Sequence, residues 1–366
     1  MRLLLFSDLH LDAAFAWAPR AVARRRRQAL RDTLVRIVGL ADEVDADAIV
    51  CGGDLYEHER FTPDTAAFLQ ATFGATDRRV VIAPGNHDWF GPGSLYVHVD
   101  WPANVTVFSE DRLAPLDLAD GLTLWGAAHR KPAGTDGFLD GGFEVGRGGV
   151  QLALFHGSER SGLPFEEDGK QPHAPFDAAQ LEAAGIDHAF LGHFHRPKAA
   201  ERHTYPGNPD PLTFGEDGVR GAVVVDVHDD GTVDRDWQVV ARSHVADIEV
   251  DVTGCASAHD AIERARAELA GRQGAVRLTV SGELAPDAEF DLDDLAHVAP
   301  HLDAVVVRRG RLHVAYDLDA IAAEPTVRGQ FVADVLADDG LTDDERERTI
   351  VVGLRALDGR DDLEVA

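Results

Sequence analysis

Five short apolar runs in residues 1–195 each lead into residues that carry acid-base or metal-binding chemistry. The clearest is Ile49–Asp54, where three apolar residues are followed by two glycines and a carboxylate. Short apolar runs bounded in this way are typical of strands in a parallel sheet that is buried on both faces. The other four are Leu3–Phe6 before Asp8 and His10, Val80–Ala83 before Asn86, His87 and Asp88, Leu152–Phe155 before His156, and Ala189–Leu191 before His193 and His195. The sequence therefore predicts an α/β fold.

The polar residues that follow these runs are expected to form one site. Ligands of open α/β sheets bind beyond the carboxyl ends of the strands, where residues distant in sequence meet. Imidazoles, carboxylates and one amide oxygen suit Mn, Fe, Zn or Ni, and these segments supply no thiolate ligand. Asp54 is the candidate to bridge two ions, because a carboxylate has two oxygens. An ordinary turn explains any single run, such as Gly53-Asp54, but does not explain all five.

Taken in order, the five blocks resemble the motifs of the calcineurin-like metallophosphoesterases. The resemblance implies a four-layer α/β/β/α core and two divalent metal ions, Mn²⁺ first, with Fe, Zn or Ni as alternatives. Carried over by position, metal one falls to Asp8, His10, Asp54 and His195, and metal two to Asp54, Asn86, His156 and His193. The same comparison makes His87 the group that faces the leaving oxygen and Asp88 its orienting partner.

A later segment, Tyr205–Pro209 and Phe214–Glu216, resembles the one that follows the last metal motif in SbcD-type DNA-repair exonucleases. Turn-forming residues also account for its composition. The resemblance implies hydrolysis of DNA phosphodiester bonds by a metal-bridging hydroxide, with His87 as general acid. It also implies an SbcC-type ATPase partner, and it allows a homodimer. A phosphodiesterase or phosphatase acting on small or nucleotide substrates is the alternative, and a non-catalytic binding module is a third.

The formal net charge of −29 bears on the choice between these functions. So acidic a chain does not favour broad adhesion to nucleic acid, which depends on basic surface. The dense basic cluster is Arg24, Arg25, Arg26 and Arg27, on the polar side of a helix predicted from about Arg20 to Val44. A solvated helix face is one interpretation of the cluster, and a patch that binds substrate phosphates is the other.

Composition shifts near Arg242, which predicts a metallophosphoesterase domain at 1–243 and an acidic C-terminal cap domain at 244–366. The second part holds 12 basic and 27 acidic residues. It is predicted to be a small α+β domain with strands at 248–252, 276–280, 304–307 and 312–316, and helices at 258–270, 327–336 and 342–357. A cap of this kind resembles the one that SbcD-type nucleases place over the metal cleft.

Cysteine usage and hydropathy predict the compartment. Cys51 and Cys255 fit neither a zinc spacing nor a disulfide framework, and a reducing cytosol is the simplest setting for them. No charged leader with a long apolar region opens the sequence, and no run approaches the ~20 apolar residues needed to cross a bilayer. We expect a cytoplasmic protein that does not bind membranes.

Overall fold

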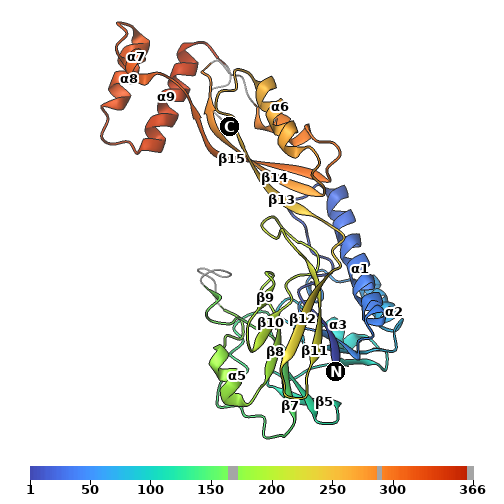
Figure 1. The fold of residues 1–366 in the computed structure, drawn as a ribbon. Helices are drawn as coiled ribbons and strands as arrows, with labels where there is room; N and C mark the ends of the chain where they lie inside the picture. The colour runs from blue at the N-terminus through green and yellow to red at the C-terminus, as the bar shows by residue number, and fades with distance from the viewer. Residues whose placement is uncertain (164–171, 287–290, 361–366) are drawn as a thin grey trace. The chain divides into compact units, whose positions relative to one another are not determined.

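The computed structural model describes residues 1–163, 172–286 and 291–360 (Figure 1). It divides into two compact units, which we call the N-terminal unit, Met1–His244, and the C-terminal unit, Val245–Ala366. Two six-stranded sheets form the centre of the N-terminal unit, and a three-stranded sheet lies in the C-terminal unit. Each unit has hydrophobic clusters of its own.

The first sheet of the N-terminal unit has the strand order β12-β11-β1-β2-β3-β4. Neighbouring strands from β1 to β4 pair in parallel, and the β11–β12 hairpin adds to β1 antiparallel. Its strands are β1 (Arg2–Phe6), β2 (Ala48–Cys51), β3 (Arg79–Ile82), β4 (Val105–Val107), β11 (Gly221–Val227) and β12 (Val233–Val239). The carboxyl ends of β1, β2 and β3 therefore meet at one edge.

The second sheet has the order β5-β6-β7-β8-β10-β9, with parallel pairing from β6 through β7 and β8 to β10. The outer strands β5 and β9 run antiparallel to their neighbours. The strands are β5 (Ala114–Ala119), β6 (Leu122–Gly126), β7 (Val150–His156), β8 (His188–Gly192), β9 (Lys198–Ala199) and β10 (His203–Tyr205). β7 and β8, which precede the predicted histidine ligands, are fully buried.

Alternation along the strands builds four layers. In β1, Leu3 and Leu5 face the second sheet and pack with side chains such as Leu154, whereas Leu4 and Phe6 face the opposite side. That side is covered by α1 (Arg20–Glu43) and α2 (Pro63–Phe73), while α5 (Ala178–Ala184) covers the outer face of the second sheet. The predicted α/β/β/α core is confirmed.

Helix α1 forms where the sequence predicts it. α1 buries Leu30, Leu34 and Ile37 along one stripe. Thr62 caps α2 by accepting a hydrogen bond from the Thr65 backbone amide, and Pro63 occupies the first turn. A short helix, α3, spans Leu95–His98. None of the helices in the described ranges combines the length and the apolar character that crossing a membrane requires.

The C-terminal unit is an α+β structure. Its parallel sheet has the order β13-β14-β15, with α6 packed against one face. The remaining helices cluster around Ile321, Val332 and Leu354. The elements are β13 (Val245–Asp251), α6 (Ala258–Leu269), β14 (Ala275–Leu284), η1 (Leu292–His297), β15 (Ala304–Val314), α7 (Leu318–Ala322), α8 (Val327–Leu336) and α9 (Asp343–Leu357).

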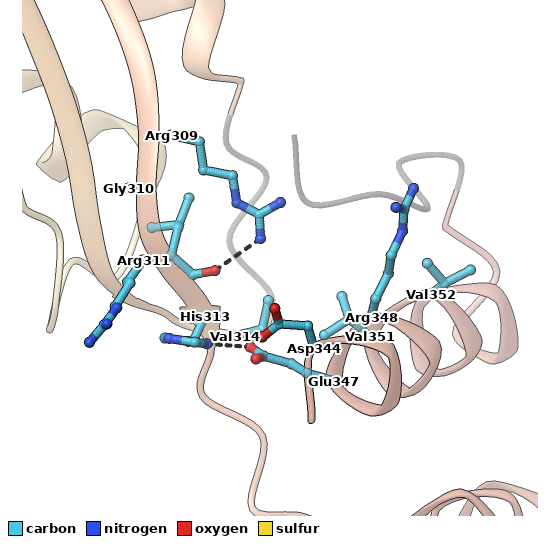
Figure 2. Close-up of a pocket in the computed structure, with 11 residues that line it drawn as sticks. Arg309, Gly310, Arg311, His313, Val314, Asp344, Glu347, Arg348, Val351 and Val352 are labelled. Carbon is cyan, nitrogen blue, oxygen red and sulfur yellow. Dashed lines mark hydrogen bonds and ion pairs between the residues drawn. The ribbon is translucent and has the colours of Figure 1, made fainter. Parts of the chain in front are cut away.

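The two strands predicted at 304–307 and 312–316 are instead the single strand β15. Arg308, Arg309 and Arg311 do not interrupt it because β15 lies at an edge of the described sheet, where these side chains stay exposed. The Arg309 guanidinium donates a hydrogen bond to the Leu312 carbonyl at 3.0 Å. Figure 2 shows the His313 ring of β15 in contact with Glu347 of α9. Both side chains line a cavity of about 860 Å³.

Candidate metal centre

The predicted ligands come together where the loops after β1, β2, β3, β7 and β8 meet. Backbone hydrogen bonds continue past the ends of β1 and β2, from Asp8 N to Gly53 O and from His10 N to Asp54 O, both 2.9 Å. Three sets of side chains place candidate ligand atoms within 4.8 Å of one another: Asp8, His10 and His195; His10, Asp54 and His87; and Asp8, Asp54 and His156. The first set contains three of the four residues predicted for metal one.

Four predicted ligands have a backbone conformation that side-chain-bearing residues rarely adopt. The φ angles of Asp8, His10, Asp54 and His193 are 56°, 51°, 52° and 108°. Such conformations cost about 1–3 kcal/mol each and persist only where the surrounding structure enforces them. Their concentration at these strand ends indicates a functional site.

Two glycines let the loops close around Asp54. A Cβ atom at Gly85 would lie 2.3 Å from Asp54 Oδ1, and one at Gly53 would lie 2.8 Å from His156 Nδ1. Gly53 also has a φ of 99°, which disfavours any other residue. The His87 amide donates to Asp54 Oδ1 at 2.8 Å, so the carboxylate is fixed from the backbone side.

Two glutamates orient histidine rings toward the centre. His10 Nδ1 lies 2.7 Å from Glu57 Oε1, and His195 Nδ1 lies 2.7 Å from Glu216 Oε1. A carboxylate on one ring nitrogen fixes the tautomer and leaves the other nitrogen to bind a metal. Sequence reasoning assigned no role to either glutamate. Glu57 follows Asp54 on the same loop, and Glu216 lies in the segment that resembled SbcD-type nucleases.

The remaining histidines surround Asp54 from the second sheet. His156 Nδ1 lies 2.9 Å from the Gly52 carbonyl oxygen, and its Nε2 lies 3.3 Å from Asp54 Oδ2. His193 contacts this pair, with Nδ1 3.2 Å from His156 Nε2 and its backbone amide donating to Asp8. Asp54 is therefore the side chain that the ligands of both sheets approach.

Two buried atoms test whether a metal fits. Neither His10 Nε2 nor Asn86 Oδ1 has a hydrogen-bond partner within the described ranges. Buried polar atoms are almost always satisfied, and a bound metal ion would satisfy these two. Imidazole nitrogen, carboxylate oxygen and amide oxygen together suit divalent transition metals. The residues therefore fit the metal centre that the sequence predicts.

Protons take part in the charge balance around Asp54. Burial alone lowers the pKa of His156, but the charge of Asp54 and the hydrogen bond to it raise that pKa to about 9. Burial opposes ionisation of Asp54, yet the neighbouring histidines, His156 foremost, hold its pKa well below the usual range. The pKa of His195 is also raised, because its bond to Glu216 outweighs burial.

The role predicted for Asp88, orienting His87, is wrong. The Asp88 carboxylate is fully buried and binds the loops themselves. It accepts hydrogen bonds from the backbone amides of Asp54 (3.1 Å), Leu55 (2.8 Å) and Gly85 (2.6 Å), and from the Tyr96 hydroxyl (2.5 Å). Burial, with the charge of Asp54, raises the pKa of Asp88 to about 6. These bonds join the backbones that carry Asp54 and Asn86.

Glu57 takes the position expected of Asp88. His87 Nδ1 lies 3.0 Å from Glu57 Oε2, and the His87 side chain is 47% exposed. Burial lowers the pKa of His87, but the Glu57 hydrogen bond and the charge of Asp54 raise it to about 9. His87 therefore lies beside the centre, exposed enough to meet a substrate and protonated near neutral pH.

A cavity of about 460 Å³ opens beside these residues. Arg220 holds one wall by donating to the His195 carbonyl and to Asn208 Oδ1, while Glu216 Oε2 accepts from Asn208 Nδ2 at 2.6 Å. The cavity is lined by Asp54, His87, His193, Phe194, His195, Arg196, Thr213, Phe214, Gly215, Glu216 and Arg220. The segment after the last histidine motif thus forms part of the site.

The arginine cluster is not one surface. Arg24 and Arg25 are exposed and Arg27 is half-buried, but Arg26 is buried. The Arg26 guanidinium donates to the Pro211 carbonyl, lies 3.8 Å from Asp210 and 5.4 Å from the Phe15 ring centroid. The predicted substrate-binding role is therefore wrong for Arg26, which joins α1 to the 210–211 loop.

Metal binding should release protons. His156 has a raised pKa of about 9, so at pH 7 its ring is protonated, and a metal on that nitrogen must displace the proton. Affinity for Mn²⁺ should therefore rise as pH rises from 6 toward 9. Calorimetric titration of metal-free protein in buffers of different ionisation enthalpy measures the proton count. Heats that do not depend on the buffer would contradict this assignment.

Replacing Arg26 should cost more stability than replacing its neighbour Arg24. Arg26→Ser leaves the buried Asp210 carboxylate without its ion-pair partner, which costs about 3–5 kcal/mol of unfolding free energy. Arg24→Ser, at an exposed position of the same helix, should stay within about 0.5 kcal/mol. Urea unfolding measures both, and equal stability of the two variants would rule out a structural role for Arg26.

Two known proteins are similar to this chain in sequence. An uncharacterized metallophosphoesterase, YhaO of Bacillus subtilis, is 25% identical over 252 residues, covering 65% of this chain and 59% of YhaO. The DNA double-strand break repair protein Mre11 of Methanopyrus kandleri is 25% identical over 298 residues, covering 69% of this chain and 60% of Mre11. The alignments thus span about three fifths of each relative.

Among solved structures, TT1561 of Thermus thermophilus aligns with a TM-score of 0.37 and 13% identity, covering 64% of this chain and 98% of TT1561. The calcineurin-like phosphoesterase family matches residues 1–197, a range that includes every candidate ligand. With more than half of its length matched, the chain belongs to the calcineurin-like phosphoesterase family.

Proposed function

We propose that this protein is a two-metal phosphodiesterase that hydrolyses DNA phosphodiester bonds. The observation that carries the proposal is the gathering of Asp8, His10, Asp54, His156 and His195. Asp54 and His195 also line a cavity, together with protonatable His87. Similarity to a DNA double-strand break repair protein and the SbcD-like segment at 205–216 favour DNA as the substrate. The cavity lining includes that segment's Phe214 and Glu216.

The proposed ligands are those predicted from sequence, with Asp54 shared between both ions. Metal one takes Asp8, His10, Asp54 and His195, and metal two takes Asp54, Asn86, His156 and His193. Mn²⁺ is the ion we favour, and Fe, Zn and Ni suit the same donor set. When bound, such ions supply a water nucleophile at neutral pH and charge that neutralises phosphoryl oxygens.

The chain's own residues position the metal-binding rings and protonate the leaving group. Glu57 and Glu216 accept hydrogen bonds from Nδ1–H of His10 and His195, so each ring keeps Nε2 for coordination. His87 holds a proton at neutral pH and donates it to the departing alkoxide oxygen. Its exposed side chain lines the same cavity as Asp54, so a phosphoester there lies within reach of both.

To bind DNA, a chain this acidic needs positive charge that offsets its repulsion of the phosphates. Bound divalent ions offset the carboxylates in the cleft, and exposed Arg24 and Arg25 offer charge on α1. In the C-terminal unit, Val327 and Leu357 are exposed apolar side chains. An SbcC-type ATPase is the partner we propose, with homodimerisation as the alternative. A cap role for this unit and a cytoplasmic location remain predictions.

A second function, hydrolysis of small or nucleotide phosphodiesters, is favoured by the net charge of −29. Arg24 and Arg25 help to distinguish the two functions, because DNA binding is expected to need them and hydrolysis of a small phosphodiester is not. The double change Arg24→Ser/Arg25→Ser should weaken binding of single-stranded DNA and flatten its salt dependence, with bis(p-nitrophenyl) phosphate hydrolysis unchanged. Fluorescence anisotropy over a salt series measures the first effect. DNA binding and cleavage at wild-type levels in the variant would exclude this helix as a DNA contact.

His87→Ala should separate metal binding from turnover. Because His87 is proposed to protonate the leaving group and not to bind metal, the variant should keep two ions per chain. Turnover of DNA, whose alkoxide is a poor leaving group, should fall by ~100-fold or more, the scale of a lost general acid. Metal analysis by mass spectrometry beside the phosphodiesterase assay checks both. Loss of one ion would instead make His87 a ligand, which its place beside His10 and Asp54 also permits.

A further inference from the structure

One carboxylate, Glu57, contacts both a candidate metal ligand and the proposed general acid. Its Oε1 lies 2.7 Å from His10 Nδ1, and its Oε2 lies 3.0 Å from His87 Nδ1. The two rings stand edge to face with centroids 4.7 Å apart. The Glu57 side chain is 21% exposed.

The backbone fixes Glu57 at the junction of the loops that carry both histidines. The Glu57 amide donates to the Leu11 carbonyl at 3.0 Å, next to His10 in the chain. The following amide, of His58, donates to the His87 carbonyl at 2.9 Å. The carboxylate therefore does not depend on a flexible reach to touch either ring.

In both contacts Glu57 must be the hydrogen-bond acceptor. If His10 binds a metal through Nε2, its proton is on Nδ1 and points to Oε1. For His87 to deliver a proton from Nε2, its Nδ1 must also carry one, which points to Oε2. The side chain that accepts from both rings needs two acceptor oxygens, and only an ionised carboxylate supplies two. A glutamine at this position has one acceptor and can satisfy one ring.

We propose that Glu57 is a positioning residue that couples the metal-one site to the leaving-group acid, an inference that rests on the proposed role of His87. When His10 Nε2 binds a metal ion, the ring keeps its proton on Nδ1 and donates a hydrogen bond to Oε1. That hydrogen bond holds the carboxylate in place. Oε2 then holds the His87 ring with Nε2 toward the cavity. The acid is thus aligned when metal one is bound, and substrates with poor leaving groups gain most from this alignment.

Glu216 is the matched control within the same centre. It orients a ring of the same predicted metal, His195, through a contact of equal length, 2.7 Å. Its second oxygen accepts from Asn208 Nδ2 and the Leu212 amide, both at 2.6 Å, and not from His87. Glu216→Gln should therefore disturb metal one without touching the acid.

The experiment compares Glu57→Gln, Glu216→Gln and His87→Ala on aryl phosphodiesters of graded leaving-group acidity, at saturating Mn²⁺. Glu57→Gln should slow p-nitrophenyl substrates about as much as Glu216→Gln does, and should lose about 10- to 100-fold more with the poorest leaving group, as His87→Ala should. Glu216→Gln should slow all substrates equally. The rate of the double variant Glu57→Gln/His87→Ala should depend on leaving-group acidity no more steeply than that of His87→Ala, because the two residues act as a unit.

A second readout does not depend on activity. Titration of metal-free protein with Mn²⁺ alone should show one of two sites weakened about 10- to 100-fold in both glutamine variants, and neither site weakened in His87→Ala. Glu57→Asp, whose shorter side chain cannot span both rings, repeats the test if the glutamine variant fails to fold.

The outcomes separate the coupling from the proposed function. A wild-type leaving-group dependence in Glu57→Gln, with His87→Ala steep, means that Glu57 serves His10 alone and overturns the coupling. A wild-type leaving-group dependence in His87→Ala would show that His87 is not the general acid, which rules out the coupling as well. DNA as substrate stays outside both results, because aryl phosphodiesters test the shared chemistry of the family.

Discussion

The centre depends on one buried anion. Asp54 is 2% exposed, and a carboxylate withdrawn from water is costly unless opposite charge or hydrogen-bond donors surround it. Here the surroundings are imidazoles from both sheets and the His87 amide. Protons on the rings compensate the charge when metal is absent, and divalent ions replace those protons when metal binds. The left-handed backbone at Asp54 and the bare glycines beside it follow from the need to enclose that group.

A second buried carboxylate keeps the enclosure in shape. Asp88 takes no direct part in the chemistry we propose, yet its oxygens receive amides from both loops that carry Asp54 and Asn86. Buried polar networks of this kind are costly to leave incomplete, so satisfied ones define a single arrangement. The arrangement of ligands thus depends on contacts that lie behind them.

Sequence reasoning succeeded where adjacency along the chain carries the information. Apolar runs followed by Asp, Asn or His identified the strands and the residues at their carboxyl ends. It failed where the partner is distant: Asp88 is next to His87 in sequence, but Glu57, 30 residues earlier, reaches the ring. Arg26 was readable in principle, because it lies four residues before Leu30 on the apolar stripe of α1, and its burial follows from that position.

The ligands come from both sheets of the sandwich. Asp8 and Asp54 follow strands of the first sheet, whereas His156 ends strand β7 of the second sheet and His193 follows its strand β8. Ions held by both sets would cross-link the two sheets at one end, so sliding of one sheet over the other would break coordination. Metal bound at 1,000 times its dissociation constant adds about 4 kcal/mol to the stability of the folded state. The cation supply of the cell therefore affects how long this fold survives as well as how fast it works.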